Sequence, residues 1–160
     1  MNRFFDCHEE ELAVACLAMA RRFHRAGRIF TFGEGCGVTD AEHVAVEFLH
    51  PVVAGKRALP AVALKGDVAG QLETLASVDD IAIAFVETAG EAMMGAVQSA
   101  RRLGMLAVIF SGKQGMAADH SFTVDCDDSL IRQEVHEVAY HVLWELVHVF
   151  FGHRGILEEA

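Results

Sequence analysis

Short apolar runs alternate with helical segments along most of this chain, and this alternation limits the possible folds more than any other feature. The runs are rich in β-branched and aromatic residues and lie at 28–32, 59–64, 81–86, 105–110 and 121–125. Helical patterns separate them at 68–77 and 91–103. Strands that alternate with helices pair in parallel through right-handed crossovers. The sequence therefore predicts an α/β fold, a three-layer α/β/α sandwich around a five-stranded parallel sheet.

Two longer helices are expected near the ends of the chain. Residues 6–26 place apolar side chains at three- and four-residue spacing, and residues 129–151 form a long apolar-rich segment. No repeat, low-complexity tract or Pro/Gly/Ser-rich linker divides the sequence. We expect one domain over residues 1–160, with an N-terminal helix in 1–27, an α/β core in 28–126 and a C-terminal helix in 129–151.

The charge pattern argues against several classes of partner. The formal net charge is -10 at pH 7, and basic residues occur at most in pairs. Nucleic acids and anionic membranes bind clustered Lys and Arg, so neither is expected, and the apolar runs are shorter than a membrane span of about 20 residues. Four cysteines without a Cys-x-x-Cys spacing, and an N-terminus without a signal-peptide pattern, are typical of the reducing cytoplasm. A small molecule or another protein remains as the partner.

A glycine-rich turn at 33–37 follows the first predicted strand. Ligands of open parallel sheets collect at the carboxyl ends of the strands, where helix N-termini present free N–H groups. Thr39 and Glu42 form a capping-box pair, which predicts a helix start near Asp40, and Pro51 ends that helix. The turn is either a ligand site or only a tight strand-to-helix connection, and its spacing alone does not decide between them.

Two sets of polar residues have the spacing of a shared helix face. His43 and Glu47 stand four residues apart and can hold one ligand together, or can form an ordinary solvent-facing pair. Gln133, Glu137 and His141 repeat at four-residue intervals on the last predicted helix and form either a site or a solvated edge. On the same helix we expect His136 and His148 to be surface or interface histidines with satisfied hydrogen bonds rather than ligands.

Two stretches of this sequence resemble the phosphoheptose isomerase family of sugar isomerase (SIS) domains. The first is Gly-Arg-Ile-Phe-Thr-Phe-Gly-Glu-Gly at 27–35, followed by Asp-Ala-Glu-His-Val-Ala-Val-Glu at 40–47. The second is Gln-Glu-Val-His at 133–136 with His141 five residues later. The resemblance covers nearly the whole chain after the first helix and implies the flavodoxin-like sandwich of an SIS domain.

The resemblance also implies roles for individual residues. Glu47 and His141 match the family's catalytic acid–base pair, with Glu47 as base and His141 as acid. The groups that bind zinc in some members match His43, Glu47, Gln133 and His141. Residues at the ends of the first and third strands, together with Gln133, match the substrate-binding positions: Gly35, Cys36, Gly37, Thr88, Ala89 and Gly90. The cofactor expected is zinc or another divalent metal, and the assembly expected is a homotetramer or a dimer.

The largest departure from the family lies in the loop expected to hold phosphate. A Ser-Thr-Ser-Gly-x-Ser run is expected there, but residues 87–92 read Glu-Thr-Ala-Gly-Glu-Ala. In addition, Gly37 stands where the family has Ser, Glu34 where it has Asn, and Pro51 where it has Arg. Two carboxylates beside a phosphate dianion repel it by about 1 kcal/mol each. The sequence therefore leaves open whether phosphate is bound.

Three functions remain open at this point. The first is an aldose–ketose isomerase like phosphoheptose isomerase, acting on a carbohydrate derivative. The second is an accessory protein that binds a metal or ligand without isomerase activity. The third is an enzyme that acts on a non-phosphorylated or cationic substrate.

Overall fold

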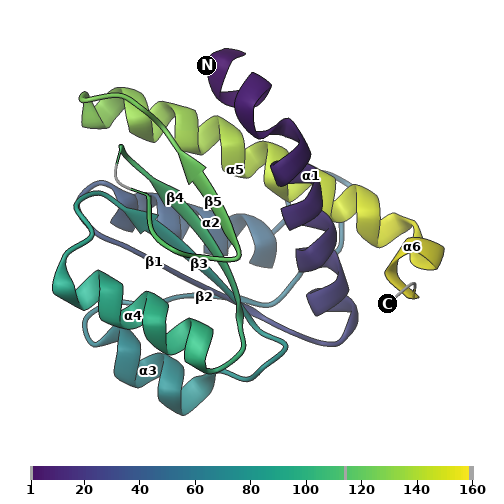
Figure 1. The fold of residues 1–160 in the computed structure, drawn as a ribbon. Helices are drawn as coiled ribbons and strands as arrows, with labels where there is room; N and C mark the ends of the chain where they lie inside the picture. The colour runs from purple at the N-terminus through teal and green to yellow at the C-terminus, as the bar shows by residue number, and fades with distance from the viewer. Residues whose placement is uncertain (1, 114, 159–160) are drawn as a thin grey trace.

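The computed structural model describes residues 2–113 and 115–158 and contains a five-stranded sheet in the order β2-β1-β3-β4-β5 (Figure 1). Every neighbouring pair of strands is parallel. The strands are β1 (Ile29–Gly33), β2 (Ala61–Ala63), β3 (Ile81–Val86), β4 (Leu106–Ser111) and β5 (His120–Thr123). The predicted α/β fold with a five-stranded parallel sheet is confirmed.

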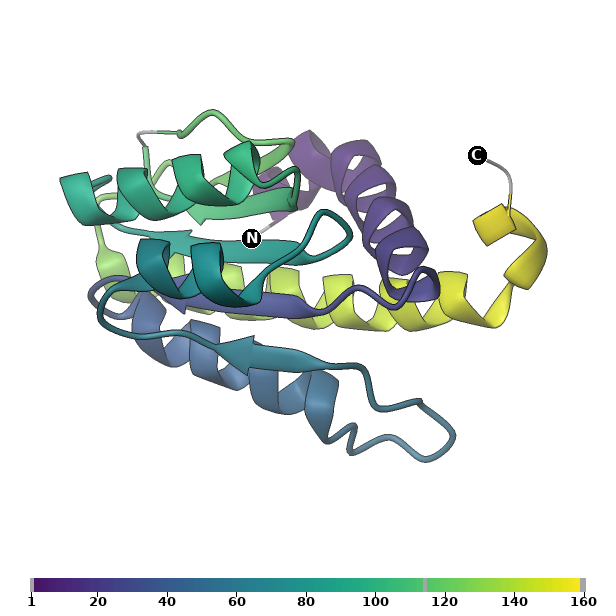
Figure 2. The same ribbon diagram turned by 90° about the horizontal axis from the view of Figure 1, so that it is seen from below.

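Helices cover both faces of the sheet. One face carries α1 (Asn2–His24), α2 (Gly37–Leu49) and α5 (Ser129–Gly152), and the other carries α3 (Val68–Leu75) and α4 (Glu91–Arg102). A short helix, α6 (Arg154–Glu158), follows α5 and was not predicted. Figure 2 shows α2 and the long α5 running side by side, which is the packing that forms the site described below.

The strand sequences explain why both faces are covered. Along β3, Ile81, Ile83 and Phe85 pack toward α1, α2 and α5, whereas Ala82 and Ala84 pack toward α3 and α4. Successive strand residues point to opposite faces, so a strand that is apolar throughout requires a helix layer on each side. All six residues of β3 and all six of β4 are buried accordingly.

The start of α2 differs from the prediction. The helix begins at Gly37 with Cys36 at the N-cap, and the Thr39 hydroxyl donates a hydrogen bond to the Cys36 carbonyl oxygen at 2.8 Å. The predicted capping box between Thr39 and Glu42 is therefore wrong. The glycine-rich turn is so tight that helical hydrogen bonding starts within it, and the Gly37 N–H donates to the Glu34 carbonyl at 2.9 Å. The predicted end of this helix before Pro51 agrees with the structure, in which α2 ends at Leu49.

Among residues 2–113 and 115–158, no helix combines the length and the apolar character that a membrane crossing requires.

Candidate metal and substrate site

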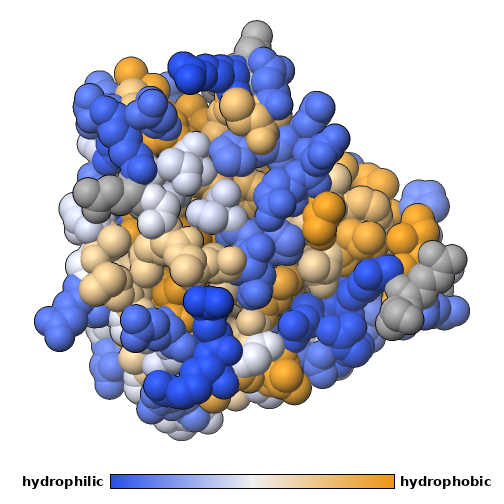
Figure 3. All heavy atoms as spheres, viewed as in Figure 1, coloured by the Kyte–Doolittle hydropathy of each residue, from blue (hydrophilic) through white to orange (hydrophobic). Residues whose placement is uncertain are grey.

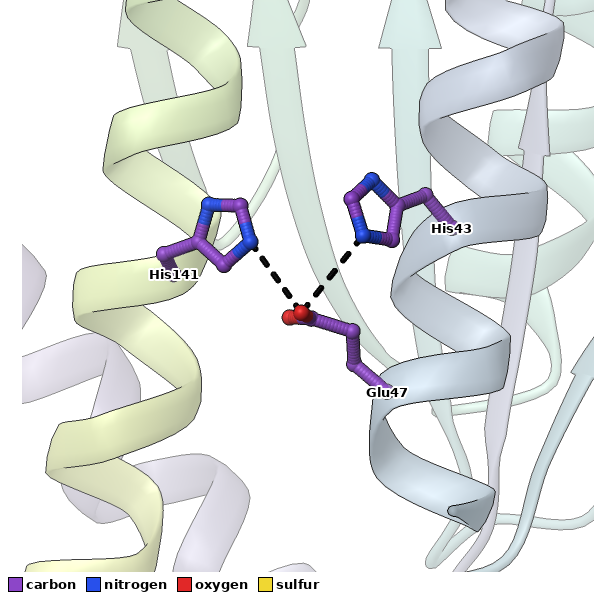
Figure 4. A group of neighbouring side chains, drawn as sticks. All are labelled: His43, Glu47 and His141. Atoms are coloured by element: carbon purple, nitrogen blue, oxygen red, sulfur yellow. Dashed lines mark hydrogen bonds and ion pairs between the residues drawn. The ribbon is translucent and has the colours of Figure 1, made fainter. Parts of the chain in front are cut away.

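Three side chains from two helices meet where α2 packs against α5 (Figure 4). His43 and Glu47 lie one turn apart on α2, and His141 projects from α5 toward them. The Nε2 atom of His141 is 3.1 Å from Oε1 of Glu47, and the Nε2 atom of His43 is 3.5 Å from the same oxygen. The Glu47 carboxylate is thus held between the two imidazole rings.

This group of three side chains has the composition and spacing of a metal site. Each of His43, Glu47 and His141 offers a ligand atom, and these atoms lie within 4.8 Å of one another. The second carboxylate oxygen of Glu47, Oε2, is buried and has no hydrogen-bond partner within the part of the chain that the structure describes. A buried charged oxygen without a partner is costly, and a cation removes that cost. Two imidazoles and a carboxylate are a ligand set that suits zinc, so the residues present fit the metal.

A hydrogen bond from His141 to the backbone directs its other ring nitrogen toward Glu47. Its Nδ1 atom lies 2.7 Å from the carbonyl oxygen of Glu137, one turn earlier on α5. A carbonyl oxygen only accepts, so Nδ1 carries the hydrogen and the Nε2 lone pair of the neutral ring faces Glu47. Two lone pairs at 3.1 Å repel unless a positive charge lies between them. Either a proton on Nε2 or a metal ion supplies that charge.

His43 is positioned by a residue that the sequence did not single out. Tyr140 lies on α5, and its hydroxyl group is 2.8 Å from Nδ1 of His43. Burial raises the pKa of Tyr140, and the nearby carboxylates of Asp40, Glu137 and Glu47 raise it further, so the phenol stays protonated. When the hydroxyl oxygen accepts from Nδ1–H, the Nε2 lone pair of His43 is free to bind a cation.

A cavity of about 360 Å³ opens beside these three side chains. Its other lining residues are Val46, His50, Val52, Val53, Trp144 and Glu145. The indole N–H of Trp144 donates to the backbone carbonyl of Glu47 at 3.1 Å, which ties α5 to α2 at the floor of the site. The volume lies within the range of small-molecule sites, about 300–1,000 Å³.

Gln133, the fourth predicted metal ligand, lies apart from the other three. Its amide nitrogen donates to Oδ1 of Asp40 at 3.1 Å and to the Thr39 hydroxyl at 3.0 Å, at the N-terminal end of α2. Gln133 precedes His141 by two turns of α5, about 12 Å along the helix axis. The structure thus brings together His43, Glu47 and His141 within one chain, and a ligand role for Gln133 stays a prediction.

Asp40 is a further site residue that the sequence reasoning missed. Its side chain is buried, and burial raises the pKa of its carboxyl group, with Glu137 adding to the rise and the Gln133 hydrogen bond opposing it. Asp40 precedes His43 by three residues and Glu47 by seven, so all three share one face of α2. This spacing of three and seven residues is the sequence feature from which Asp40 could have been identified.

The predicted substrate-binding residues gather at two neighbouring strand ends. Gly35, Cys36 and Gly37 lie in the turn after β1, and Thr88, Ala89 and Gly90 lie in the loop after β3, which pairs with β1. His43 lies six residues beyond Gly37, about 9 Å along α2. This second region is therefore adjacent to the group formed by His43, Glu47 and His141 but does not coincide with it.

The prediction that His136 and His148 lie at the surface is wrong, because they are only 6% and 8% exposed, whereas both are hydrogen-bonded to the backbone, as expected of histidines that are not ligands. Nε2 of His136 lies 3.3 Å from the carbonyl oxygen of Ser111, and the two ring nitrogens of His148 lie near the carbonyl oxygens of Trp144 and Arg57. The buried stripe of α5 is wider than an apolar pattern suggests, because backbone carbonyl oxygens at the end of β4 and in the 50–60 loop lie within hydrogen-bond distance of these rings.

Comparison with known proteins defines the class and then the family. No protein-family model matches the chain. The fold is that of SIS domains: the sugar isomerase domain of an RpiR transcription factor from Sphaerobacter thermophilus superposes with a TM-score of 0.66 at 15% identity, over 94% of this chain and 84% of that one. A phosphoheptose isomerase structure from Neisseria gonorrhoeae superposes with a TM-score of 0.81 at 20% identity, over 91% and 89% of the two chains.

Sequence comparison identifies the family within this class. A phosphoheptose isomerase from Desulfovibrio desulfuricans is 32% identical over 165 residues, which cover 89% of this chain and 78% of that protein. The chain belongs to the phosphoheptose isomerase family.

Proposed function

We propose that this protein is an aldose–ketose isomerase for a carbohydrate derivative, with Glu47 as base, His141 as acid and a divalent metal held by His43, Glu47 and His141. The observation that carries the proposal is the Glu47 carboxylate, which lies between two imidazole rings and has one buried oxygen without a partner among the described residues. Relatives named phosphoheptose isomerase support the reaction class.

The geometry suits a proton transfer between neighbouring carbons. Isomerisation of an aldose to a ketose needs a base that takes a carbon-bound proton and an acid that protonates the carbonyl oxygen. Glu47 and His141 line the same cavity, so a sugar seated there contacts both groups. When Nε2 of His141 carries a proton instead of a metal ion, it lies 3.1 Å from Oε1 of Glu47, keeps the carboxylate in one orientation and can pass that proton to a substrate oxygen. A divalent metal, when bound, supplies polarisation of the substrate carbonyl.

Metal analysis and an isomerase assay test this proposal together. We expect about one divalent ion per chain in the purified protein, and loss of that ion in His43→Ala and His141→Ala. Glu47→Gln is expected to lower kcat for sedoheptulose 7-phosphate or its unphosphorylated form by a factor of about 10² to 10⁴. His153→Ala is the matched control, because His153 is an exposed histidine at the end of the same helix.

Two results would contradict the proposal in different ways. Equal metal content in the two histidine variants and in the His153→Ala control would contradict the proposed metal site. Metal binding without turnover of either heptose would leave a ligand-binding protein, the second function that the sequence allowed.

We also propose that the chain forms a homo-oligomer, a tetramer or a dimer. Figure 3 shows apolar surface where the end of α5 and α6 lie beside α1, and exposed apolar side chains there include Val149 and Ile156. Val52 and Val53, beside the catalytic cavity, are 93% and 47% exposed. Apolar surface of this kind is typical of association sites. Light scattering after gel filtration tests this, and a monomer at all concentrations would contradict it.

A further inference from the structure

The side chain of Glu34 fills a cluster of backbone N–H groups in the loop between β3 and α4. Its Oε1 atom accepts from the N–H groups of Glu87 at 2.9 Å, Thr88 at 2.5 Å and Ala89 at 3.0 Å. The Thr88 hydroxyl lies 3.3 Å from the same oxygen. Four donors thus converge on one carboxylate oxygen that comes from the end of the neighbouring strand, β1.

Such a cluster of N–H groups is a binding site for an anion. Successive N–H groups that point to one centre attract negative charge, and the effect is strengthened just before the N-terminus of a helix, here α4. Ala89 adopts φ 54°, a left-handed conformation that is unfavourable for alanine. In this conformation, the N–H groups of the loop donate hydrogen bonds to Glu34. We call this cluster of donors, the N–H groups of residues 87–89 with the Thr88 hydroxyl, the anion cradle.

The charged residues around the anion cradle leave little to attract a second anion. Arg132 pairs with the Glu87 carboxylate, with Nη2 3.4 Å from Oε1. Lys113 pairs with Asp127, with Nζ 2.8 Å from Oδ1. The nearby cations are thus neutralised by carboxylates of this chain.

A second carboxylate, that of Glu87, lies beside the turn that carries Glu34. A Cβ atom added at Gly35 would lie 1.8 Å from Oε2 of Glu87, so the Glu87 side chain packs directly against the turn that carries Glu34. A Cβ atom added at Gly90 would lie 3.7 Å from Oε2 of Glu34, so the other oxygen of Glu34 lies over the start of α4. A phosphate group entering here would meet both carboxylates.

The larger space beside the cradle is also acidic. Glu34 lies on the wall of a cavity of about 460 Å³ between α2, α3 and α4. The other charged residues of that wall are Glu42, Asp67 and Lys65, and Lys65 is paired with Glu42. The carboxylates outnumber the single cation, which disfavours an anionic ligand and leaves hydroxyl groups as suitable partners.

We propose that Glu34 determines substrate specificity: its carboxylate acts as a built-in anion in the cradle, so this protein takes an unphosphorylated sugar derivative rather than a phosphate ester. The part of the proposal that concerns a sugar substrate rests on the isomerase function proposed above. The occupation of the cradle by Glu34 does not, and it is tested separately.

Titration with inorganic phosphate tests the cradle directly. In the wild-type protein, we expect the amide signals of residues 87–89 to stay unshifted in NMR spectra up to about 10 mM phosphate, which means a dissociation constant well above about 10 mM. Glu34→Ala empties the cradle and is expected to bind phosphate at least tenfold more tightly. Glu34→Gln leaves an amide oxygen in the cradle and is expected to gain much less.

The matched control is Glu91→Gln. Glu91 lies in the first turn of α4, so its removal changes the charge near the cradle by the same amount without emptying it. An equal gain in Glu91→Gln and Glu34→Ala would show an effect of net charge and overturn the proposal. Phosphate-dependent shifts of the 87–89 amides in the wild-type protein would overturn it even if Glu34→Ala failed to fold.

Turnover of one ketoheptose with and without its phosphate ester tests the substrate class. We expect kcat/KM of the wild-type protein to favour the unphosphorylated sugar by at least tenfold, and Glu34→Ala to shift the ratio toward the ester by a similar factor. A wild-type preference for the ester would overturn the proposal. If neither sugar is turned over, the isomerase function fails, while the phosphate titration still decides the role of Glu34.

Discussion

The hydroxyl group of Tyr140 lies 2.8 Å from Nδ1 of His43, and this contact joins the core of the protein to the candidate metal site. Tyr140 is only 2% exposed, and its ring packs at right angles to Phe85 with centroids 5.8 Å apart. The ring therefore has a single position, and through its hydroxyl group it sets the orientation of the His43 imidazole. Mutation of a residue that orients a metal ligand in this way typically weakens metal binding by about 10- to 100-fold.

We predict that Tyr140→Phe weakens zinc binding by about 10-fold. The ring keeps its packing, so the stability of the metal-free protein should change little. We expect its free energy of unfolding to fall by about 1 kcal/mol, the contribution of one hydrogen bond. Competition with a chelator of known affinity measures the effect. Unchanged zinc affinity in a folded Tyr140→Phe protein would show that His43 does not depend on this contact.

A second prediction concerns the buried His136. Burial lowers its pKa to about 4, and the charge of Arg132 adds to this, although the hydrogen bond to Ser111 opposes it. In the unfolded chain the pKa is about 6.5. Between about pH 4 and pH 6.5 the imidazole of His136 binds a proton in the unfolded state but not in the folded state. The contribution of His136 to the free energy of unfolding is therefore complete above about pH 6.5 and falls as the pH drops toward 4.

The expected loss is about 3 kcal/mol of unfolding free energy attributable to His136 over that range, at 1.36 kcal/mol per pKa unit. Denaturant unfolding of the wild-type protein and of His136→Gln at a series of pH values measures it. Gln keeps a hydrogen-bond donor but does not titrate. If both proteins lose the same stability between pH 7 and pH 4.5, the acid sensitivity comes from other groups.

A third prediction concerns the space around two glycines. A Cβ atom added at Gly37 would lie 2.6 Å from Cβ of Phe85, which is buried in the core. Gly37→Ala should therefore cost about 1–3 kcal/mol through forced movement of the turn. At Gly95, in the middle of α4, a Cβ atom would have no described atom within 4 Å. Gly95→Ala should stabilise the protein by about 1 kcal/mol, because alanine favours helices.

Thermal and denaturant unfolding of the two variants tests this contrast. The result also bears on the departure from the family at this position, since a serine at residue 37 has the same Cβ atom as alanine. A neutral Gly37→Ala would mean that the turn moves away from β3 at no cost.

A fourth prediction concerns the buried carboxylate of Asp80, which is 1% exposed and lies at the start of β3. It accepts hydrogen bonds from the backbone N–H and the side chain of Arg28 and from the N–H and hydroxyl of Ser77. Burial alone would raise the pKa of Asp80, but these hydrogen bonds outweigh it and hold the pKa below its usual value. The stabilisation is therefore present above about pH 4 and is lost as the pH falls through the lower, folded-state pKa.

We expect Asp80→Ala to destabilise the protein by about 3 kcal/mol, because it leaves these donors without their acceptor. The neighbouring Asp79 forms an ion pair with Arg25 at 2.7 Å, but both side chains are more than a third exposed. Asp79→Ala is the matched control and should cost less than about 1 kcal/mol. Similar losses at the two positions, measured by denaturant unfolding at pH 7, would contradict the role of the Asp80 network.

The sequence alone determined the order along the chain of the five strands and of the helices other than α6, and the residues that share a helix face. The alternation of apolar runs with helical segments predicted the parallel sheet. Four-residue spacing placed His43 and Glu47 together on one helix face. These features are local: the period of a helix or strand is set by backbone geometry, and it is readable from neighbouring positions in the chain.

The tertiary structure decided which of these faces meet. It brought His141 to Glu47, seated Gln133 on Asp40 rather than beside the other predicted ligands, buried His136, and turned Glu34 into the loop after β3. Each of these contacts joins segments far apart in sequence, and its geometry depends on how the crossovers pack the helices onto the sheet. The partners of a polar side chain are therefore set by packing between elements, which the period of a single element does not encode.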